Sequence, residues 1–405
     1  MGKKKNAKER SAYNDDMRKC ITFIVTKDCQ LACKYCYLVG KNSKERMSWD
    51  VAKRTIDYIL SDTENFSDEC VQFDFIGGEP FLEIDLIDKI CDYLKIEMYR
   101  RNHKWFNDYV FMVTTNGLNY HSEKVQRFIS KNITHLQICI TIDGTERKHD
   151  INRIYKESGR GSYRDVVKNI PLWLSQFEGI HTKVTISHDD IPYIKESVAH
   201  LFNLGIQNVL INCVFEDVWE EGDDKLLEEQ LIQLADYIID NRYYIDHTCS
   251  FFDENIGHPL ADDGNWCGAG MMLSVDAAGN FYPCTRFAAY SLRSRKPIII
   301  GNVYSGTGIN KNLLRPYLTL KRSLQSSEEC MKCEVASGCA WCQGENYDAA
   351  DTPTIYQRST TICKMHKARV RANNYYWNKL FRKLELEGRR EEFEKSKPTV
   401  NNTIC

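Results

Sequence analysis

Residues 29–36 read Cys29-Gln30-Leu31-Ala32-Cys33-Lys34-Tyr35-Cys36, a stretch with three cysteines in a C-x3-C-x2-C spacing. It follows residues 21–25, a β-branched run that predicts a buried strand. A four-iron cluster normally takes four cysteine thiolates, so three leave one iron free for another ligand. Because active sites of α/β proteins lie at the carboxyl ends of strands, the stretch predicts an open cluster in an α/β enzyme.

The alternative occupants of this loop are zinc or a set of redox-active thiols. Structural zinc sites usually combine two cysteine pairs or add histidine, and residues 29–36 have neither nearby in the sequence. The spacing therefore favours a cluster over zinc.

Composition narrows the class of protein. A chain of 405 residues predicts two or three domains, and its 42% hydrophobic content includes no apolar run long enough to cross a membrane. We expect a cytoplasmic protein with no membrane partner, and the net charge of -2 gives no reason to expect nucleic acid. Without a secretory signal, the 17 cysteines indicate metal binding rather than disulfides.

Strand and helix patterns alternate along the first half of the chain, which predicts a parallel sheet. Further strands are predicted at 71–76, 109–114, 136–142, 184–187 and 209–215, and an amphipathic helix at 223–240. The predicted division is a tail at 1–19, an α/β barrel at 20–222, a bridging helix at 223–250, a cysteine-rich domain at 251–368 and a C-terminal helix and tail at 369–405.

Polar motifs follow three of the predicted strands. They are Gly77-Gly78-Glu79-Pro80, Thr114-Thr115-Asn116-Gly117 and Thr141-Ile142-Asp143-Gly144, the last followed by Arg153. Each is by itself compatible with an ordinary turn. Paired glycines also let a ligand approach the backbone, and a carboxylate at a strand end accepts hydrogen bonds from an ammonium group.

The cysteine loop, with an aromatic residue before its last cysteine, resembles the signature of the radical S-adenosylmethionine (SAM) superfamily. That resemblance implies a partial (β/α)6 barrel, a 4Fe-4S cluster whose open iron binds SAM, and a 5'-deoxyadenosyl radical. It implies cluster ligation and catalysis by Cys29, Cys33 and Cys36. The implied SAM contacts are Tyr35, Gly77, Gly78, Glu79, Pro80, Thr115, Asn116, Thr141, Asp143 and Arg153. Thr141 stands where the family pattern has serine, and His149 is predicted to be structural.

A second group of cysteines lies in the C-terminal third: Cys267, Cys284, Cys330, Cys333, Cys339, Cys342 and Cys363. Residues 330–342 alone are compatible with a zinc ribbon. The whole array resembles the SPASM domain, which carries auxiliary iron–sulfur clusters, although two residues rather than three separate Cys339 from Cys342.

The SPASM resemblance implies two auxiliary 4Fe-4S clusters, three clusters in all. One would be closed by Cys330, Cys333, Cys339 and Cys363, and the other held by Cys267, Cys284 and Cys342. Residues 268–273 contain no further cysteine, so we expect the second auxiliary cluster to be open as well. A substrate thiolate is a natural ligand for that open iron.

Residues 337–346 and 363–370 resemble the maturases of CXXX-repeat peptides, which belong to the thioether-forming ranthipeptide and sactipeptide enzymes. The resemblance implies an oxidoreductase of ribosomal peptide (RiPP) maturation that links a cysteine sulfur to carbon, here to the β-carbon of an acidic residue. Implied partners are a Cys-rich precursor peptide with a leader, and a flavodoxin or ferredoxin as reductant. A separate leader-recognition protein is one route to leader binding, because residues 1–19 are too few to build a recognition domain.

Two other functions remain open at this stage. One is an anaerobic sulfatase maturase making formylglycine, although such enzymes carry Asp after the cysteine equivalent to Cys284, where this chain has Thr285. The other is a non-catalytic electron-relay protein with structural clusters, which the open three-cysteine loop disfavours.

Overall fold

The computed structural model describes residues 19–254, 256, 263, 267–335, 339 and 342–396. Of the predicted N-terminal tail, only Lys19 is among them, and it begins the first strand. Residues 397–405 of the predicted C-terminal tail lie outside the described residues, as does part of the 337–346 segment.

Four parallel strands form the first wall of the fold, in the order of the sequence. They are β1 (Lys19–Thr26), β2 (Val71–Gly77), β3 (Tyr109–Thr115) and β4 (Leu136–Ile140). The helices that connect them are α1 (Trp49–Ile59), α2 (Ile84–Arg100) and α3 (Glu123–Asn132). All four strands lie where the alternating sequence pattern predicted them, although β4 ends two residues earlier than expected.

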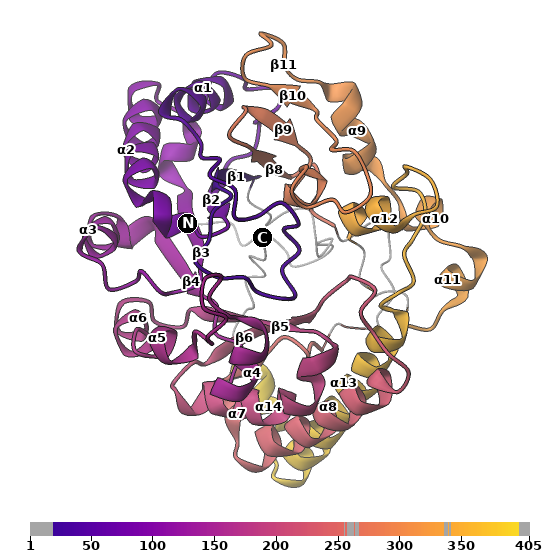
Figure 1. Cartoon of the computed structure of the whole chain (residues 1–405). Coiled ribbons are helices and arrows are strands. Elements are labelled where there is room, and N and C mark those ends of the chain that lie inside the picture. Colours follow the sequence, from indigo (N-terminus) through magenta and orange to yellow (C-terminus); the bar gives the residue numbers. More distant parts are fainter. Residues whose placement is uncertain are drawn as a thin grey trace, which may run out of the picture.

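A second parallel sheet continues the wall. It contains β5 (His181–Ile186), β6 (Asn208–Cys213) and the short β7 (Thr248–Cys249). An isolated parallel bridge between Thr141 and Lys183 joins it to the end of β4. Its helices are α4 (Glu146–Asn152), α5 (Tyr163–Val167), α6 (Ile170–Gln176) and α7 (Ile194–Asn203). The helices lie outside the ring that the strands trace (Figure 1).

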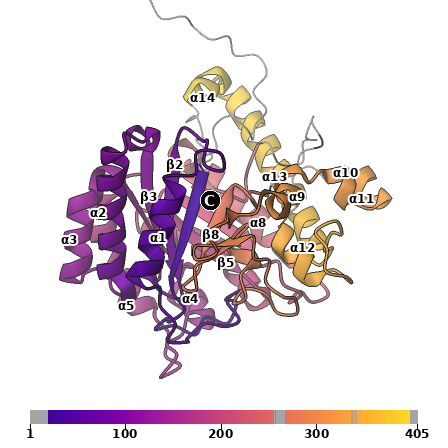
Figure 2. The ribbon, with the colours of Figure 1, turned by 90° about the horizontal axis from the view of Figure 1, so that it is seen from above.

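The cysteine-rich region begins by extending the first sheet. Strand β8 (Met272–Val275) pairs in parallel with β1 and is followed by three antiparallel strands, which makes the sheet mixed. These are β9 (Asn280–Tyr282), β10 (Gly301–Asn302) and β11 (Gly308–Ile309). The helices of this region are α9 (Lys311–Thr319), α10 (Arg322–Gln325), α11 (Glu328–Lys332) and α12 (Gln343–Ala349). They lie on the side of the molecule away from α2 and α3 (Figures 1 and 2).

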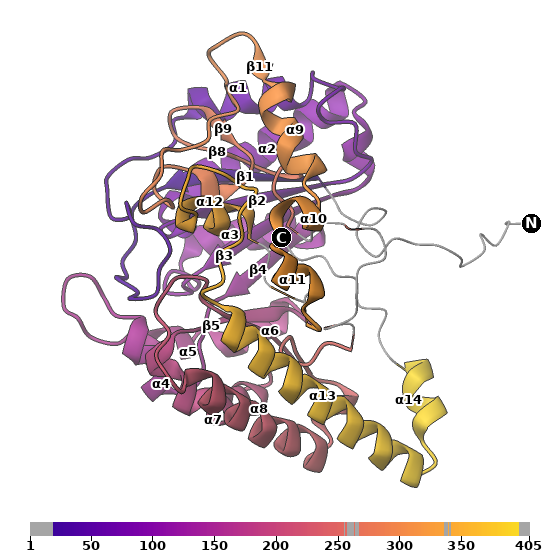
Figure 3. The ribbon, with the colours of Figure 1, turned by 90° about the vertical axis from the view of Figure 1, so that its right-hand side faces the viewer.

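Two long helices connect the strand ring to the C-terminal region. Helix α8 (Asp223–Asp240) has the bounds that its periodicity predicts, and α13 (Cys363–Leu386) runs beside it (Figure 3). Ion pairs join them, with Arg371 2.6 Å from Glu228 and Lys379 2.7 Å from Asp236. The short α14 (Arg390–Ser396) follows.

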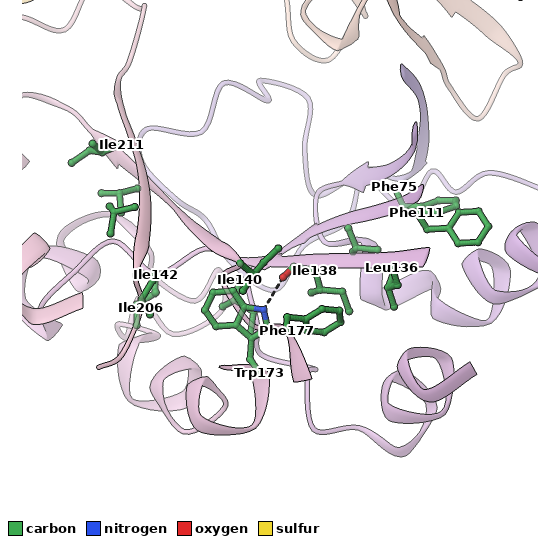
Figure 4. Close-up of a cluster of buried hydrophobic side chains, with 14 of the residues drawn as sticks. Phe75, Phe111, Leu136, Ile138, Ile140, Ile142, Trp173, Phe177, Ile206 and Ile211 are labelled. Carbon is green, nitrogen blue, oxygen red and sulfur yellow. Dashed lines mark hydrogen bonds between the residues drawn. The ribbon is translucent and has the colours of Figure 1, made fainter. Parts of the chain in front are cut away.

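The two faces of the strand wall differ in chemistry. The face toward the helices is apolar and includes Phe75, Phe111, Ile138 and Ile140 (Figure 4). Trp173 of α6 packs there with no exposed surface, and its Nε1 donates to Ile138 O at 2.7 Å. The opposite side, which we call the inner face, carries the polar residues Thr22, Gln72, Asp74, Gln137 and Lys183.

None of the helices in the described ranges is long and apolar enough to cross a membrane.

The first prediction concerns Trp173. Trp173→Ala should lower the free energy of unfolding by about 3–5 kcal/mol, because it removes a fully buried ring. Trp173→Phe should cost about 1–3 kcal/mol, since the buried Ile138 carbonyl then loses its donor. Chemical denaturation of the variants measures both values. Leu386→Ala is the control, because that side chain is 81% exposed and its removal should change stability by less than about 0.5 kcal/mol.

Candidate active site

The three-cysteine loop lies at the carboxyl end of β1, as predicted. Backbone hydrogen bonds tie it to the end of α4 and the residues that follow, with Ala32 N donating to Ile154 O at 2.8 Å and Lys34 N to Asn152 O at 3.1 Å. The Lys156 ammonium and Asp28 add an ion pair at 2.7 Å. The loop is therefore fixed by contacts to a segment more than a hundred residues later in the chain.

Cys29 is the most enclosed of the three thiols, with 5% of its surface exposed. Its Sγ accepts from Leu31 N at 3.3 Å and lies 3.9 Å from the Asn116 side-chain amide. Burial, together with the negative charge of Glu79, raises the pKa of Cys29 to about 12. The thiol is protonated at neutral pH unless a bound metal stabilises the thiolate.

Glu79 joins the ends of two neighbouring strands. Its side chain is fully buried and accepts from Thr115 Oγ1 and Asn116 N, each at 2.7 Å, and from Phe81 N at 3.0 Å. Burial raises the pKa of its carboxyl group. Pro80, the next residue, begins the short 3-10 helix η1 (Pro80–Glu83) that the Glu79 side chain caps.

The paired glycines before Glu79 lie where another backbone segment comes too close to leave room for a side chain. A Cβ on Gly77 or Gly78 would lie 2.2 Å from the carbonyl oxygens of Thr26 and Asp28, respectively. Glu79 N donates to that same Asp28 carbonyl at 2.8 Å. The glycines thus hold the end of β2 directly against the start of the cysteine loop.

A second polar group links the loop to the end of β4. The Tyr35 hydroxyl donates to Asp143, and Arg153 donates from Nη1 to the Tyr35 oxygen at 3.0 Å. Burial opposes ionisation of Asp143, yet the charges of Lys148 and Arg153 lower its pKa overall. Arg153 is only 6% exposed, and its Nε has no hydrogen-bond partner among the described residues.

Two further residues of the Thr141–Arg153 segment have structural contacts. Thr141 N donates to Thr115 O at 3.0 Å, so the predicted hydroxyl residue lies beside the end of β3. His149 is fully buried, accepts from Asp143 N at 3.2 Å and lies 3.0 Å from Ser162 Oγ. Burial and the neighbouring Arg153 charge lower the pKa of His149 to about 3, which fits the structural role predicted for it.

These residues fit the predicted SAM site. A buried carboxylate at Glu79 suits an ammonium group, and the unpaired Nε of Arg153 suits a carboxylate. Three thiols at one strand end suit a cluster with an open iron. Within these described residues, Glu79, Asn116 and Arg153 would hold the methionyl part of SAM beside the loop.

Three cysteines of the C-terminal region come together around the start of α12. Cys342 is the N-cap residue, and its Sγ accepts from Glu345 N at 3.4 Å, while Cys267 Sγ accepts from Gln343 N at 3.5 Å. Burial raises the pKa of Cys284, and Cys267 and Cys342 raise it further by their negative charge. The structure thus groups the three residues predicted to share the open auxiliary cluster.

The other four predicted ligands lie as two pairs. Cys339 and Cys363 share a hydrogen bond that lowers the pKa of Cys363, and Arg358 Nη2 lies 2.8 Å from Cys339 Sγ. Cys330 and Cys333 belong to one turn at α11, closed by a backbone bond of 3.3 Å. Because Val335 O lies 3.0 Å from His366 Nε2 on α13, this turn is close to the helix that Cys363 begins.

Among the residues that the structure describes, no three His, Cys, Asp or Glu side chains are spaced to hold a single metal ion. In a four-iron cluster each thiolate binds a different iron, so cluster ligands stand farther apart than those of one ion.

An ion network links the two cysteine regions, and the sequence motifs gave no signal for it. Arg286 donates to Glu216 at 3.0 Å and to Glu345 at 2.5 Å, and Arg293 binds Glu345 at 2.6 Å. The Arg286 guanidinium also lies 5.1 Å from the ring centroid of Tyr37, next to Cys36. Glu216 follows β6, so Arg286 connects the strand ring, the first loop and the start of α12.

The family model of the radical SAM superfamily matches residues 23–201. An uncharacterised protein of Methanocaldococcus jannaschii is 30% identical over 66% of this chain and 85% of its own length. The mycofactocin maturase MftC of Mycobacterium tuberculosis is 25% identical over 79% of this chain and 76% of its own. A serine-type anaerobic sulfatase-maturating enzyme of Bacteroides thetaiotaomicron is 22% identical over 77% and 78%, respectively.

Two solved structures share the fold. The anSMEcpe structure with bound AdoMet and Cp18Cys peptide has a TM-score of 0.65 and 17% identity, covering 89% of this chain and 99% of that chain. Streptococcus suis SuiB bound to precursor peptide SuiA has a TM-score of 0.56 and 16% identity, covering 85% and 76%.

The second prediction tests the loop. Cys29→Ala, Cys33→Ala and Cys36→Ala should each abolish formation of 5'-deoxyadenosine after anaerobic reconstitution with iron and sulfide, because a cluster cannot be held by two thiolates. Chromatography of the products measures this. The matched control is Cys91→Ala, which removes a buried thiol from α2 and should preserve SAM cleavage. Full cleavage by any loop variant would contradict the assignment.

The third prediction tests Glu79. Glu79→Gln should weaken SAM binding to the reconstituted protein roughly 10–100-fold, because a charge-assisted hydrogen bond is lost. Equilibrium dialysis measures the dissociation constant, and iron content checks that the cluster persists. Glu83→Gln, at the end of the short helix that Glu79 caps and ion-paired with Arg46 at 3.1 Å, is the control and should bind SAM normally. Equal SAM affinities for Glu79→Gln and the parent would refute the proposed contact.

Proposed function

The chain belongs to the radical SAM superfamily, whose members use SAM and a 4Fe-4S cluster, and from this we propose that it is a peptide maturase that forms thioether cross-links. Its substrate is a ribosomally synthesised Cys-rich peptide with a leader. The product joins a cysteine sulfur to a carbon of another residue, the β-carbon of an acidic residue, as in the ranthipeptide-forming freyrasin maturase that the sequence resembles.

Support for a peptide substrate comes from the proteins of the same fold. The anSMEcpe structure contains a bound peptide, and the SuiB structure contains a precursor peptide. Both align with most of this chain, over 89% and 85% of its length.

The main support for thioether formation is that Cys267, Cys284 and Cys342 lie together. The segment after Cys267 turns back against Cys284, since Gly270 N donates to Pro283 O at 2.8 Å and Met272 N to Gly268 O at 2.8 Å. That segment has no thiol to add. A cluster on these three cysteines therefore leaves one iron available to a sulfur ligand of the substrate.

A cluster on Cys29, Cys33 and Cys36 with SAM at its open iron would supply a 5'-deoxyadenosyl radical able to remove a hydrogen atom from the substrate carbon. Forming the carbon–sulfur bond removes a hydrogen atom from carbon, which would leave in 5'-deoxyadenosine, and a proton from sulfur, which would pass to solvent. The one remaining electron would be accepted by the auxiliary cluster, and the electron that cleaves SAM to methionine and the radical would come from the reductant. The chain itself holds the reacting groups in position and excludes water from the site. Glu79, Asn116 and Arg153 hold SAM, and the Arg286 network fixes the second cysteine group relative to the first.

The remaining partners follow from the same proposal. A flavodoxin or ferredoxin reduces the first cluster in the cytoplasm. The leader binds through a separate recognition protein, through the cysteine-rich region, or by strand addition at an exposed strand edge. Two auxiliary clusters, the second on Cys330, Cys333, Cys339 and Cys363, complete the cofactor set.

Formylglycine formation is the second candidate function. It is supported by the sulfatase-maturating relative, whose similarity covers 77% of this chain, about as much as that of MftC. In this chain Thr285 follows Cys284, and a threonine hydroxyl is a far weaker base than a carboxylate. The nearby carboxylates of Glu216 and Glu345 are both paired with Arg286. Among the described residues, the two carboxylates named here are both paired, which favours thioether formation.

The fourth prediction decides between the two. A Cys-rich peptide encoded beside this protein and co-expressed with it should lose two hydrogens per cross-link, with tandem mass spectra placing the bond at a cysteine. A sulfatase peptide converted to an aldehyde would instead support formylglycine formation. If the protein releases no 5'-deoxyadenosine, the result would support the electron-relay function instead.

The same experiment separates the roles of the two cysteine groups. Cys284→Ala should still cleave SAM but form no cross-link, whereas Cys36→Ala should do neither. Cross-linking by Cys284→Ala at the parent rate would show that the substrate sulfur does not need the second group.

A further inference from the structure

The inner face of the strand wall is open as well as polar. Gln137 of β4, Lys183 of β5 and Asn212 of β6 are all exposed, although their neighbours on the opposite face, such as Ile138 and Val184, are fully buried. The contrast follows from the alternation of side chains along a strand. These three side chains are therefore accessible to a ligand.

Deeper on the same face, several buried polar groups have no partner. Parallel pairing places Ser274, Thr22 and Asp74 in one row across β8, β1 and β2, with Gln72 in the next row. Gln72 is 1% exposed and Ser274 is 0% exposed. The side-chain oxygen and nitrogen of Gln72, Ser274 Oγ and Asp74 Oδ1 lack a hydrogen-bond partner within the described ranges.

Such groups are uncommon in folded proteins, because each unpaired buried donor or acceptor is destabilising. Four of them in adjacent rows indicate that a polar molecule bonds here in the working state. Neither Gln72 nor Ser274 belongs to the predicted SAM contacts, and Gln72 lies at the amino end of β2, away from the carboxyl end that carries Glu79.

Lys183 is the cation of this face. It pairs by a backbone bridge with Thr141, and two residues later Thr185 N donates to Asp143 Oδ1 at 3.2 Å. Two residues of a strand span about 6–7 Å, so Lys183 lies about that far from Thr185, toward the amino end of β5 and on the same face. Thr185 is the residue that contacts the Tyr35–Asp143–Arg153 group. Lys183 forms no ion pair with any residue in the described part of the chain.

We propose that the inner face recognises an acidic side chain of the peptide substrate, with the Lys183 ammonium binding its carboxylate and the unpaired groups of Gln72 and Ser274 bonding the adjoining peptide. This inference rests on the peptide-maturase function proposed above. It adds to that function the side chains that recognise the acidic residue of the substrate. Arg153 is unsuited to this role, because it already binds Tyr35 and faces the predicted SAM carboxylate.

A structural role for Lys183 is the competing explanation. Asp74 faces it from β2, and burial raises the pKa of Asp74 to about 7 while the Lys183 charge opposes that rise. If Lys183 served only to balance the charge of Asp74, the loss of Lys183 alone would weaken peptide binding, and removing both charges together would restore that binding. The experiment below includes that double variant.

The test measures binding of fluorescein-labelled synthetic peptides to the reconstituted full chain by anisotropy. The peptides carry cysteine and one aspartate, and matched peptides carry asparagine instead. Lys183→Met should weaken binding of the aspartate peptide roughly tenfold and leave binding of the asparagine peptide unchanged. Lys183→Arg should retain most of the affinity. Lys124→Met, which removes an exposed lysine on α3, is the matched control and should bind both peptides like the parent.

The outcomes separate the explanations. Asp74→Asn combined with Lys183→Met should stay as weak as Lys183→Met alone, and recovery of aspartate-peptide binding in the double variant would show a structural role and overturn the proposal. Equal affinity of the parent for the two peptides would also overturn it. Binding is read without turnover, so a carboxylate preference in an enzyme that makes no thioether would refute the proposed function and leave the recognition site standing.

Discussion

The buried carboxylate of Glu79 is the contact on which the arrangement of the site depends. It accepts hydrogen bonds from the end of β3 through Thr115 and Asn116, and so fixes the carboxyl ends of two strands relative to each other. The same Asn116 lies against Cys29, which brings the cysteine loop to this corner. A Glu79 carboxylate buried without these donors would strongly destabilise the fold. The ionised form of Glu79 therefore depends on the strand ends staying in this arrangement.

The two halves of the molecule share backbone and charge contacts. Strand β8 hydrogen-bonds along β1, directly before the loop that holds the first three cysteines. Arg286 then reaches from the neighbourhood of Cys284 to Glu216 after β6 and to the ring of Tyr37. Because Arg286 is enclosed by two carboxylates and an aromatic ring, small relative movements of the cysteine groups would break several charged contacts at once. This is a physical reason for the two groups to keep a fixed separation.

The inner face explains how a substrate could fit between these groups. The strand ring presents apolar residues to its helices and polar ones to the opposite side, and that side remains open at Lys183 and Asn212. Buried polar atoms without partners on this face favour a ligand that carries many hydrogen-bonding groups, as a peptide does.

Much of the fold was predictable from local patterns. The six predicted strands and helix α8 occur at their expected places, because hydrophobic periodicity encodes which face of an element is buried. The glycines before Glu79 predicted a close approach of a ligand to the backbone, whereas the close approach that the structure shows is that of the Thr26 and Asp28 carbonyls, which belong to a distant segment. The cysteine spacings likewise identified both groups of thiols, and the structure gathers Cys267, Cys284 and Cys342 at one helix start.

Other features depend on which distant segments meet, and no local pattern specifies that. The contact of Tyr35 with Asp143 and Arg153 joins residues more than a hundred positions apart, and the Arg286 network joins three separate segments. The open position of Lys183 is set by strand register and sheet curvature. The sequence by itself thus determined the strands and helices of this protein and the spacing of its cysteine groups, through hydrophobic periodicity and residue order. Only the tertiary structure decided which charges are paired and which face a substrate, because pairing requires contact across the fold.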